Sequence, residues 1–262
     1  MNTQLHPTGQ ELLEAVFSDD PAPDIHAAVV VSHPGDECLG ASWLLSRLYD
    51  RTSVFRLTTC GQSAPSDAIT MTGLPADRCQ NLGLASGSLA NDLEELTWLV
   101  SAAVKTLSPR LLITHAWEGV NLDHDAVAFA VQMTALMLPR FGIASPLVVE
   151  FQCHHDGPEA VHHDAAAPIW EQGVRVDFGP DSRRLKEQIL RSQLGSMRTI
   201  HHSALHSEIY RPQLGNHVTQ RPEHFARRYH DAPWCTVSDF RSNAATVARS
   251  FAQTGLIATA SV

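Results

Sequence analysis

Short apolar runs and amphipathic segments alternate along the first two thirds of the chain. Four of the runs are rich in aliphatic and β-branched residues, which is typical of buried strands. They cover residues 25–31, 52–59, 110–114 and 146–151. Strands that alternate with helical segments favour a parallel sheet with helices on both faces. The pattern therefore predicts an α/β fold with a doubly wound, mostly parallel sheet.

The segments that follow these strands carry apolar residues at helical spacing. Helices are expected over residues 38–49, 93–106, 125–138 and 183–198, with a cap from Asn91 or Asp92 before the second and a stop at Pro139 after the third. Residues 62–87, which are rich in Ser, Pro and Gly, are expected to be mostly loop. We expect a single domain over residues 1–262, with its core at about 25–195. Residues from about 196 to 262 are expected to form an irregular C-terminal cap or rim.

Composition and charge narrow the class of protein. No apolar run approaches the roughly 20 residues of a membrane span, and the first residues lack the pattern of a signal peptide, so we expect a cytoplasmic protein without a membrane partner. The 19 Lys and Arg stand against 28 Asp and Glu, and this net charge of −9 argues against nucleic-acid binding. Five scattered cysteines without a C-x-x-C pair indicate reduced thiols. A small-molecule substrate is the expected partner, and the sequence leaves a homo-oligomer open.

Candidate chemistry lies where the first strand ends. Ligands bind beyond the carboxyl ends of strands in open α/β sheets, and the sequence HPGDE stands there at residues 33–37. An imidazole and a carboxylate three residues apart on a tight turn can converge on one cation, which suits Zn²⁺ or a similar metal. His33 and Asp36 are therefore candidate metal ligands. A lone His-x-x-Asp is as readily a simple hydrogen-bonded turn, so a third ligand is needed.

A second polar segment, EGVNLDHD at residues 118–125, follows the third strand and opens a helix. His124 could be the missing ligand, and Asp123 beside it can orient a neighbouring group. Two histidines and one aspartate leave a coordination position open, as in a catalytic zinc site. Zinc lowers the pKa of bound water toward about 7, which supplies a nucleophile for an amide or ester.

Both segments resemble the motifs of the PIG-L/LmbE-type zinc-dependent N-deacetylases. SHPGDECLGASWLL at 32–45 is similar to the first motif, usually (A/S)HPDDE, and THAWEGVNLDHDAVAFAV at 114–131 to the second, commonly THxxEGGHPDHDAxAxAV. PLVVEFQCHH and KEQILRSQ are similar to later segments of the family. The resemblance covers about residues 25–195. It implies a Rossmann-like fold and a metal bound by His33, Asp36 and His124.

Two departures from the family fall on its acid–base residues. The family has an Asp, thought to act as general base, where this chain has Gly35. It has a His, which helps to stabilise the oxyanion or protonate the leaving amine, where this chain has Asn121. Loss of a general base typically lowers a rate roughly 10²- to 10⁴-fold. Asn121 can still donate a hydrogen bond to an oxyanion.

The nearest candidates for a substitute base are Glu37, Glu118 and His115, although Glu37 is expected to brace the motif from behind the ligands. Two functional hypotheses follow. The leading one is a metal-dependent hydrolase of the N-deacetylase or amidase type, with altered acid–base residues, that acts on a small N-acylated amino-sugar-like or specialised metabolite. The alternative is a catalytically impaired or repurposed protein that uses the same cleft for binding, regulation or different chemistry.

Overall fold

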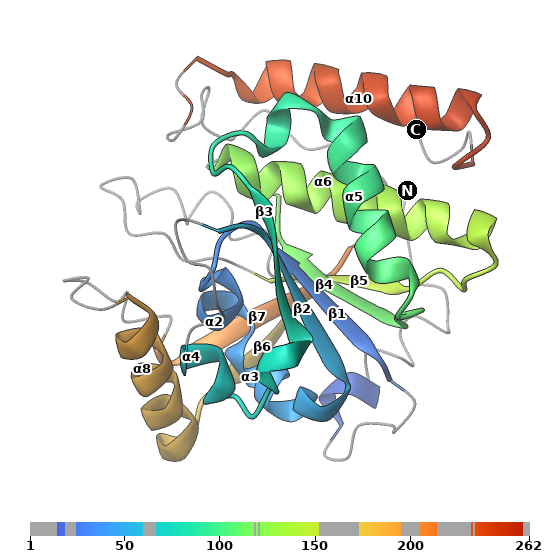
Figure 1. Ribbon diagram of the computed structural model, residues 1–262. Helices are drawn as coiled ribbons and strands as arrows, with labels where there is room; N and C mark the ends of the chain where they lie inside the picture. The colour runs from blue at the N-terminus through green and yellow to red at the C-terminus, as the bar shows by residue number, and fades with distance from the viewer. Residues whose placement is uncertain are drawn as a thin grey trace.

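The computed structural model describes residues 15–18, 25–59, 67–117, 119, 121–151, 173–194, 205–213, 232 and 234–258. Within these residues a sheet of seven strands has the order β3-β2-β1-β4-β5-β7-β6 (Figure 1). The strands are β1 (Ala27–Val31), β2 (Thr52–Thr58), β3 (Cys79–Leu84), β4 (Leu111–His115), β5 (Leu147–Phe151), β6 (Val174–Asp177) and β7 (Ser207–Pro212). The first five are parallel, whereas β7 is antiparallel to both β5 and β6.

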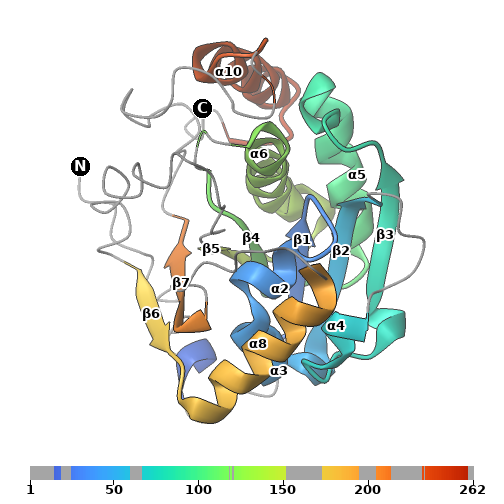
Figure 2. The ribbon, with the colours of Figure 1, turned by 90° about the vertical axis from the view of Figure 1, so that its left-hand side faces the viewer.

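Helices cover both faces of this sheet, which confirms the predicted α/β, Rossmann-like architecture. They are α2 (Asp36–Gly40), α3 (Ser42–Arg47), α4 (Asp67–Thr70), α5 (Leu93–Lys105), α6 (Leu122–Met137), α8 (Pro180–Leu194) and α10 (Val237–Gln253), with short 3₁₀ turns at Tyr49–Arg51, Ala76–Arg78, Leu89–Asn91 and Leu138–Phe141. One face carries α5, α6 and α10, and the other carries α2, α3, α4 and α8 (Figure 2).

The central strand β1 is buried on both faces, as its sequence predicts. Ala28 and Val30 belong to the apolar cluster under α5 and α6, whereas Ala27, Val29 and Val31 belong to the cluster under α2 and α3. This division follows from the twofold alternation of side chains along a strand. The sheet therefore separates two cores.

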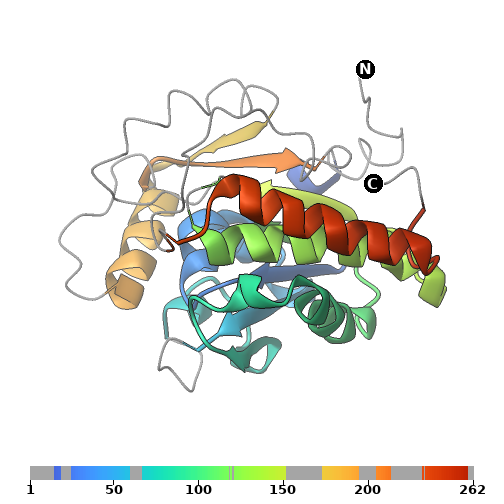
Figure 3. The same cartoon turned by 90° about the horizontal axis from the view of Figure 1, so that it is seen from above.

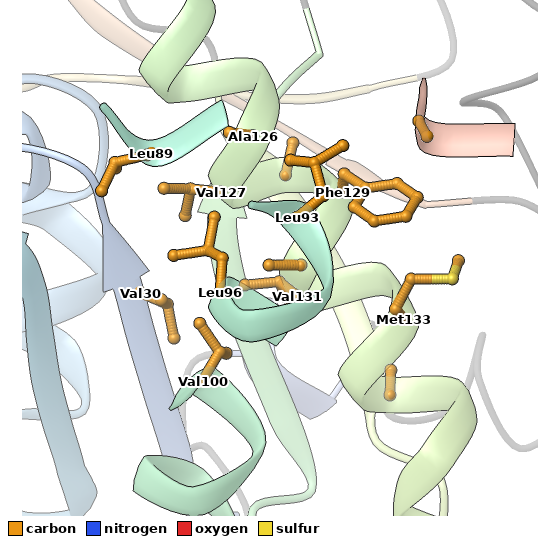
Figure 4. Close-up of a cluster of buried hydrophobic side chains, with 14 of the residues drawn as sticks. Val30, Leu89, Leu93, Leu96, Val100, Ala126, Val127, Phe129, Val131 and Met133 are labelled. Carbon is orange, nitrogen blue, oxygen red and sulfur yellow. The ribbon is translucent and has the colours of Figure 1, made fainter. Parts of the chain in front are cut away.

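The helix α6 is buried along almost its whole length. Its apolar side chains, with those of α5, pack over Val30 of β1 (Figure 4). The outer side is covered because α10 lies over α6 (Figure 3), contacts α5 and adds Phe240 and Phe251 to the same cluster. A helix enclosed in this way needs no polar face. This explains the apolar run that was predicted to be a buried helix over residues 125–138.

The predicted helix over residues 38–49 is instead divided into α2 and α3. The break lies at Ala41, and the backbone N–H groups of Ser42 and Trp43 donate to the carboxylate of Glu208 at 3.0 Å each. Lys186 forms an ion pair with Glu208 and donates to the carbonyls at the end of α2. The break is thus stabilised by charged groups of α8 and β7, which helical spacing alone does not reveal.

Two further regions differ from the sequence prediction. Within residues 62–87, expected to be mostly loop, the structure forms α4 and the edge strand β3, whose half-exposed side chains give a weak apolar signal. The C-terminal part, expected to be irregular, contributes β7 to the interior of the sheet and forms α10. The capping box of Thr236 and Asp239 is a local signal that could have indicated α10. None of the helices in the described ranges is long and apolar enough to cross a membrane.

Candidate metal centre

The candidate site lies where the strand order reverses between β1 and β4. The chain leaves β1 toward α2 on one face and leaves β4 toward α6 on the other, so the carboxyl ends of these strands form a topological switch point, the place where ligands bind in open α/β sheets. His33 and Asp36 follow β1, His115 ends β4, and His124 lies in the first turn of α6. Residues from two separate strand ends therefore meet at one place.

Asp36 is held inside its own turn. Its Oδ2 atom accepts the backbone N–H of His33 at 2.8 Å and the hydroxyl of Ser32 at 2.9 Å. The turn passes through Gly35, which has a left-handed backbone with φ 107° and ψ −21°. Burial by itself would raise the pKa of Asp36, but the surrounding imidazoles of His124, His115 and His33 hold that pKa well below its usual value. Asp36 is therefore a carboxylate.

The predicted ligands converge on this carboxylate. His33 Nδ1 lies 3.3 Å and His124 Nε2 lies 3.4 Å from Asp36 Oδ2. One possible ligand atom from each of the three residues lies within 4.8 Å of the other two. Burial lowers the pKa of His124 to about 4, helped by His115, so its imidazole is neutral, which is the form that binds metals. Two imidazoles and one carboxylate are a donor set that suits zinc, and the cluster could hold a metal.

His115 supports the ligands from behind. Its Nε2 atom accepts the backbone N–H of Ser32 at 3.0 Å, so the imidazole proton lies on Nδ1. Its ring is fully buried and stacks on that of His124, with centroids 3.9 Å apart and an interplanar angle of 16°. Because Nε2 already accepts a hydrogen bond, this geometry does not favour His115 as a substitute base.

Glu37 is also engaged in the interior. It is fully buried, its Oε2 accepts the N–H of Gly35 at 3.1 Å, and its Oε1 pairs with Arg56 Nη2 at 2.5 Å. Arg56 itself is fully buried on β2. These contacts connect the carboxylate of Glu37 to the turn at Gly35 and to β2. Arg56 was not predicted from the sequence, although a charged residue within an apolar strand is a signal for such a pair.

Asn121, at one of the two positions that depart from the family, caps the helix that carries His124. Its Oδ1 atom accepts the backbone N–H of His124 at 3.0 Å. This contact uses only the carbonyl end of the side chain and leaves the Nδ2 group able to donate. Glu118, the third candidate for a substitute base, lies outside the described residues.

Asp123 is buried beside His33 and contacts it directly. Asp123 Oδ2 lies 3.2 Å from His33 Nε2. Burial lowers the pKa of His33, but the hydrogen bonds to Asp123 and Asp36 outweigh this and raise it to about 10. The exposed hydroxyl of Ser86 also lies 3.0 Å from His33 Nε2. Ser86 and Ser32 both contact the predicted ligands; Ser32 is the first residue of the SHPGDE motif, whereas no sequence motif includes Ser86.

The chain was compared with known proteins. No protein-family model matches it, and no curated protein matches it in sequence. Among solved structures, N,N'-diacetylchitobiose deacetylase from Pyrococcus horikoshii, in complex with its inhibitor MPG, matches with a TM-score of 0.53. The match covers 84% of this chain and 97% of that one at 13% identity. The chain shares the fold of this deacetylase.

Two other solved structures match less well. The conserved protein TT1542 from Thermus thermophilus has a TM-score of 0.49 and 18% identity, over 65% of this chain and 79% of that one. The A40926 pseudoaglycone deacetylase Dbv21 has a TM-score of 0.47 and 16% identity, over 71% of this chain and 96% of that one. At these identities the similarities concern the fold alone.

Proposed function

We propose that this protein is a metal-dependent hydrolase of the N-deacetylase or amidase type, acting on a small N-acylated amino-sugar-like or specialised metabolite. The observation that carries the proposal is the convergence of His33, Asp36 and His124 at the switch point of the sheet. The fold shared with N,N'-diacetylchitobiose deacetylase supports it. So does the resemblance of the two sequence segments to deacetylase motifs.

Zinc is the proposed cofactor, with His33, Asp36 and His124 as its ligands. When bound, zinc would lower the pKa of a coordinated water molecule and polarise the acyl carbonyl of the substrate. Residues of the chain would hold the metal and its ligands in position. Asp36 brings the negative charge that a divalent cation requires, and His115 and Ser32 hold Asp36 and His124 in place.

Asn121 is the proposed donor to the oxygen of the substrate carbonyl. Its Oδ1 is used by the cap of α6, so its amide orientation is set and its Nδ2–H group is left to act as donor. Gly35 offers no side chain for proton transfer. Glu37 and His115 are held by internal hydrogen bonds, and Glu118 is therefore the substitute base that we propose from the three candidates. A substrate carboxylate or an ordered water beside Gly35 is an alternative to Glu118 as the general base.

The test combines metal content with hydrolysis. Protein purified from zinc-supplemented medium should contain about one zinc per chain by elemental analysis, and it should release acetate from at least one member of a panel of N-acetylated amino sugars. Asp36→Ala should lose both the zinc and the activity, because it removes a ligand. Asp181→Ala is the matched control, since Asp181 is a fully exposed carboxylate on α8.

Two results would count against the proposal in different ways. Wild-type protein without any divalent metal would exclude the metal site. Protein that binds zinc but hydrolyses no N-acyl compound would show that the cleft has been repurposed, which is the alternative that Gly35 and Asn121 raised.

A further inference from the structure

Asp123 lies at the meeting point of three segments that are distant in the sequence. Its carboxylate accepts the backbone N–H of Gly87 at 2.6 Å through Oδ2 and that of Leu89 at 3.1 Å through Oδ1. Oδ2 also lies 3.2 Å from His33 Nε2. Asp123 itself is only 1% exposed, in the first turn of α6. It thus joins α6, the loop after β3, and the turn after β1.

We propose that Asp123 is a positioning residue for the metal ligand His33. The inference rests on the proposed metal site and extends it. The two backbone N–H groups that Asp123 accepts favour its ionised form, and an ionised carboxylate has no proton to donate, so the hydrogen atom between Asp123 and His33 belongs to Nε2. Nδ1, which lies 3.3 Å from Asp36 Oδ2, is then the nitrogen that would bind the metal, and the proton that it carries in the metal-free protein would be released on metal binding. A carboxylate behind a ligating histidine fixes its tautomer and ring orientation in this way.

Ser86 also contacts His33 Nε2, but Asp123 is better suited to hold the ring. The Ser86 hydroxyl is exposed, neutral and able to rotate. Asp123 is buried and immobilised by two backbone hydrogen bonds, and a hydrogen bond to an ionised acceptor is roughly twice as strong as one between neutral groups. The charged partner therefore determines the orientation of the imidazole.

The same contacts link His33 to the loop after β3. Gly87, with φ 80°, turns the loop after β3 so that its N–H points at Asp123. The geometry of a metal ligand and the position of this loop are therefore coupled through one carboxylate. In the second motif of the family, the Asp that corresponds to Asp123 stands two residues after a histidine. In this chain Asn121 replaces that histidine, and its Oδ1 caps α6 by accepting the N–H of His124.

Metal affinity of the complete chain tests the proposal. The affinity for Zn²⁺ is measured by chelator competition, and the visible spectrum of the Co²⁺-loaded protein is recorded, for wild type, Asp123→Asn and Ser86→Ala. Asp123→Asn keeps the size of the side chain but weakens the acceptor of His33. It should lower zinc affinity about 10- to 100-fold and shift the Co²⁺ bands, whereas Ser86→Ala should change both by less than about twofold.

The outcomes separate this inference from the function on which it rests. Wild type that binds no Zn²⁺ or Co²⁺ overturns the metal site itself. Wild type that binds, together with an Asp123→Asn variant of equal affinity and spectrum, overturns only the role of Asp123. A larger loss in Ser86→Ala than in Asp123→Asn also overturns it. Thermal unfolding of the metal-free variants confirms that affinities are compared between folded proteins.

Discussion

At the scale of single residues, Gly35 is the position where this chain departs most clearly from the deacetylase motif. Its φ of 107° is a backbone conformation that residues with a side chain rarely adopt. The N–H of Gly35 is also held by Glu37, which is itself paired with Arg56. The turn that presents Asp36 is therefore built around a glycine, and its backbone conformation disfavours the aspartate that the family has there.

Gly35→Asp should lower the free energy of unfolding by about 1–3 kcal/mol, because the turn would hold a residue with a side chain at a strained, positive φ. Urea denaturation monitored by circular dichroism measures the change. Gly255→Asp is the matched control, because Gly255 also has a left-handed backbone, with φ 73°, and lies in open space after α10. This variant should lose a comparable amount of stability, and its zinc uptake should equal that of wild type. A Gly35→Asp variant as stable as wild type would show that the turn accepts the family residue.

At the scale of elements, the short helix α2 lies unusually close to β5. A Cβ atom added to Gly40 would stand 1.9 Å from Cδ2 of Phe151, whose ring is fully buried. Only glycine allows this approach, and the approach sets the distance between α2, which begins at Asp36, and the sheet. Lys186 and Glu208 then hold the other end of α2 against α3.

Gly40→Ala should therefore destabilise the protein by about 1–3 kcal/mol, although alanine normally favours a helix. It should also weaken zinc binding, because α2 must move away from Phe151 and carries Asp36 with it. Gly179→Ala serves as control, since nothing lies within 4 Å of an added Cβ there. Differential scanning calorimetry and zinc titration measure both effects. Unchanged melting temperature in Gly40→Ala would contradict the packing argument.

At the scale of the whole molecule, the net charge of −9 bears on the kind of partner. A protein that neutralises phosphates needs a basic surface, and this composition opposes one. We predict no retardation of duplex DNA or single-stranded RNA in a gel-shift assay at about 150 mM salt, with a basic DNA-binding protein as positive control. Retardation that weakens as salt increases would contradict a role restricted to small molecules.

The parts of the fold that the sequence predicted are those encoded by local pattern. The apolar runs of β1, β2, β4 and β5 indicated buried strands because strands covered on both faces need no polar side. Of the two caps predicted for α5, Asn91 and Asp92, the structure uses Asp92, which accepts the N–H of Glu95. The edge strand β3 was missed because its half-exposed residues show neither alternation nor a continuous apolar run.

The sequence by itself also determined that His33 and Asp36 lie together, because a tight turn brings residues three apart into contact, and the motifs pointed to His124. Only the tertiary structure decided that His124 reaches Asp36, that Asp123 contacts His33 across 90 residues of chain, and that β7 enters the sheet beside β5. These contacts depend on which distant segments pack against each other. Such packing depends on the whole core, and it produces no periodic pattern in the local sequence from which it could be predicted.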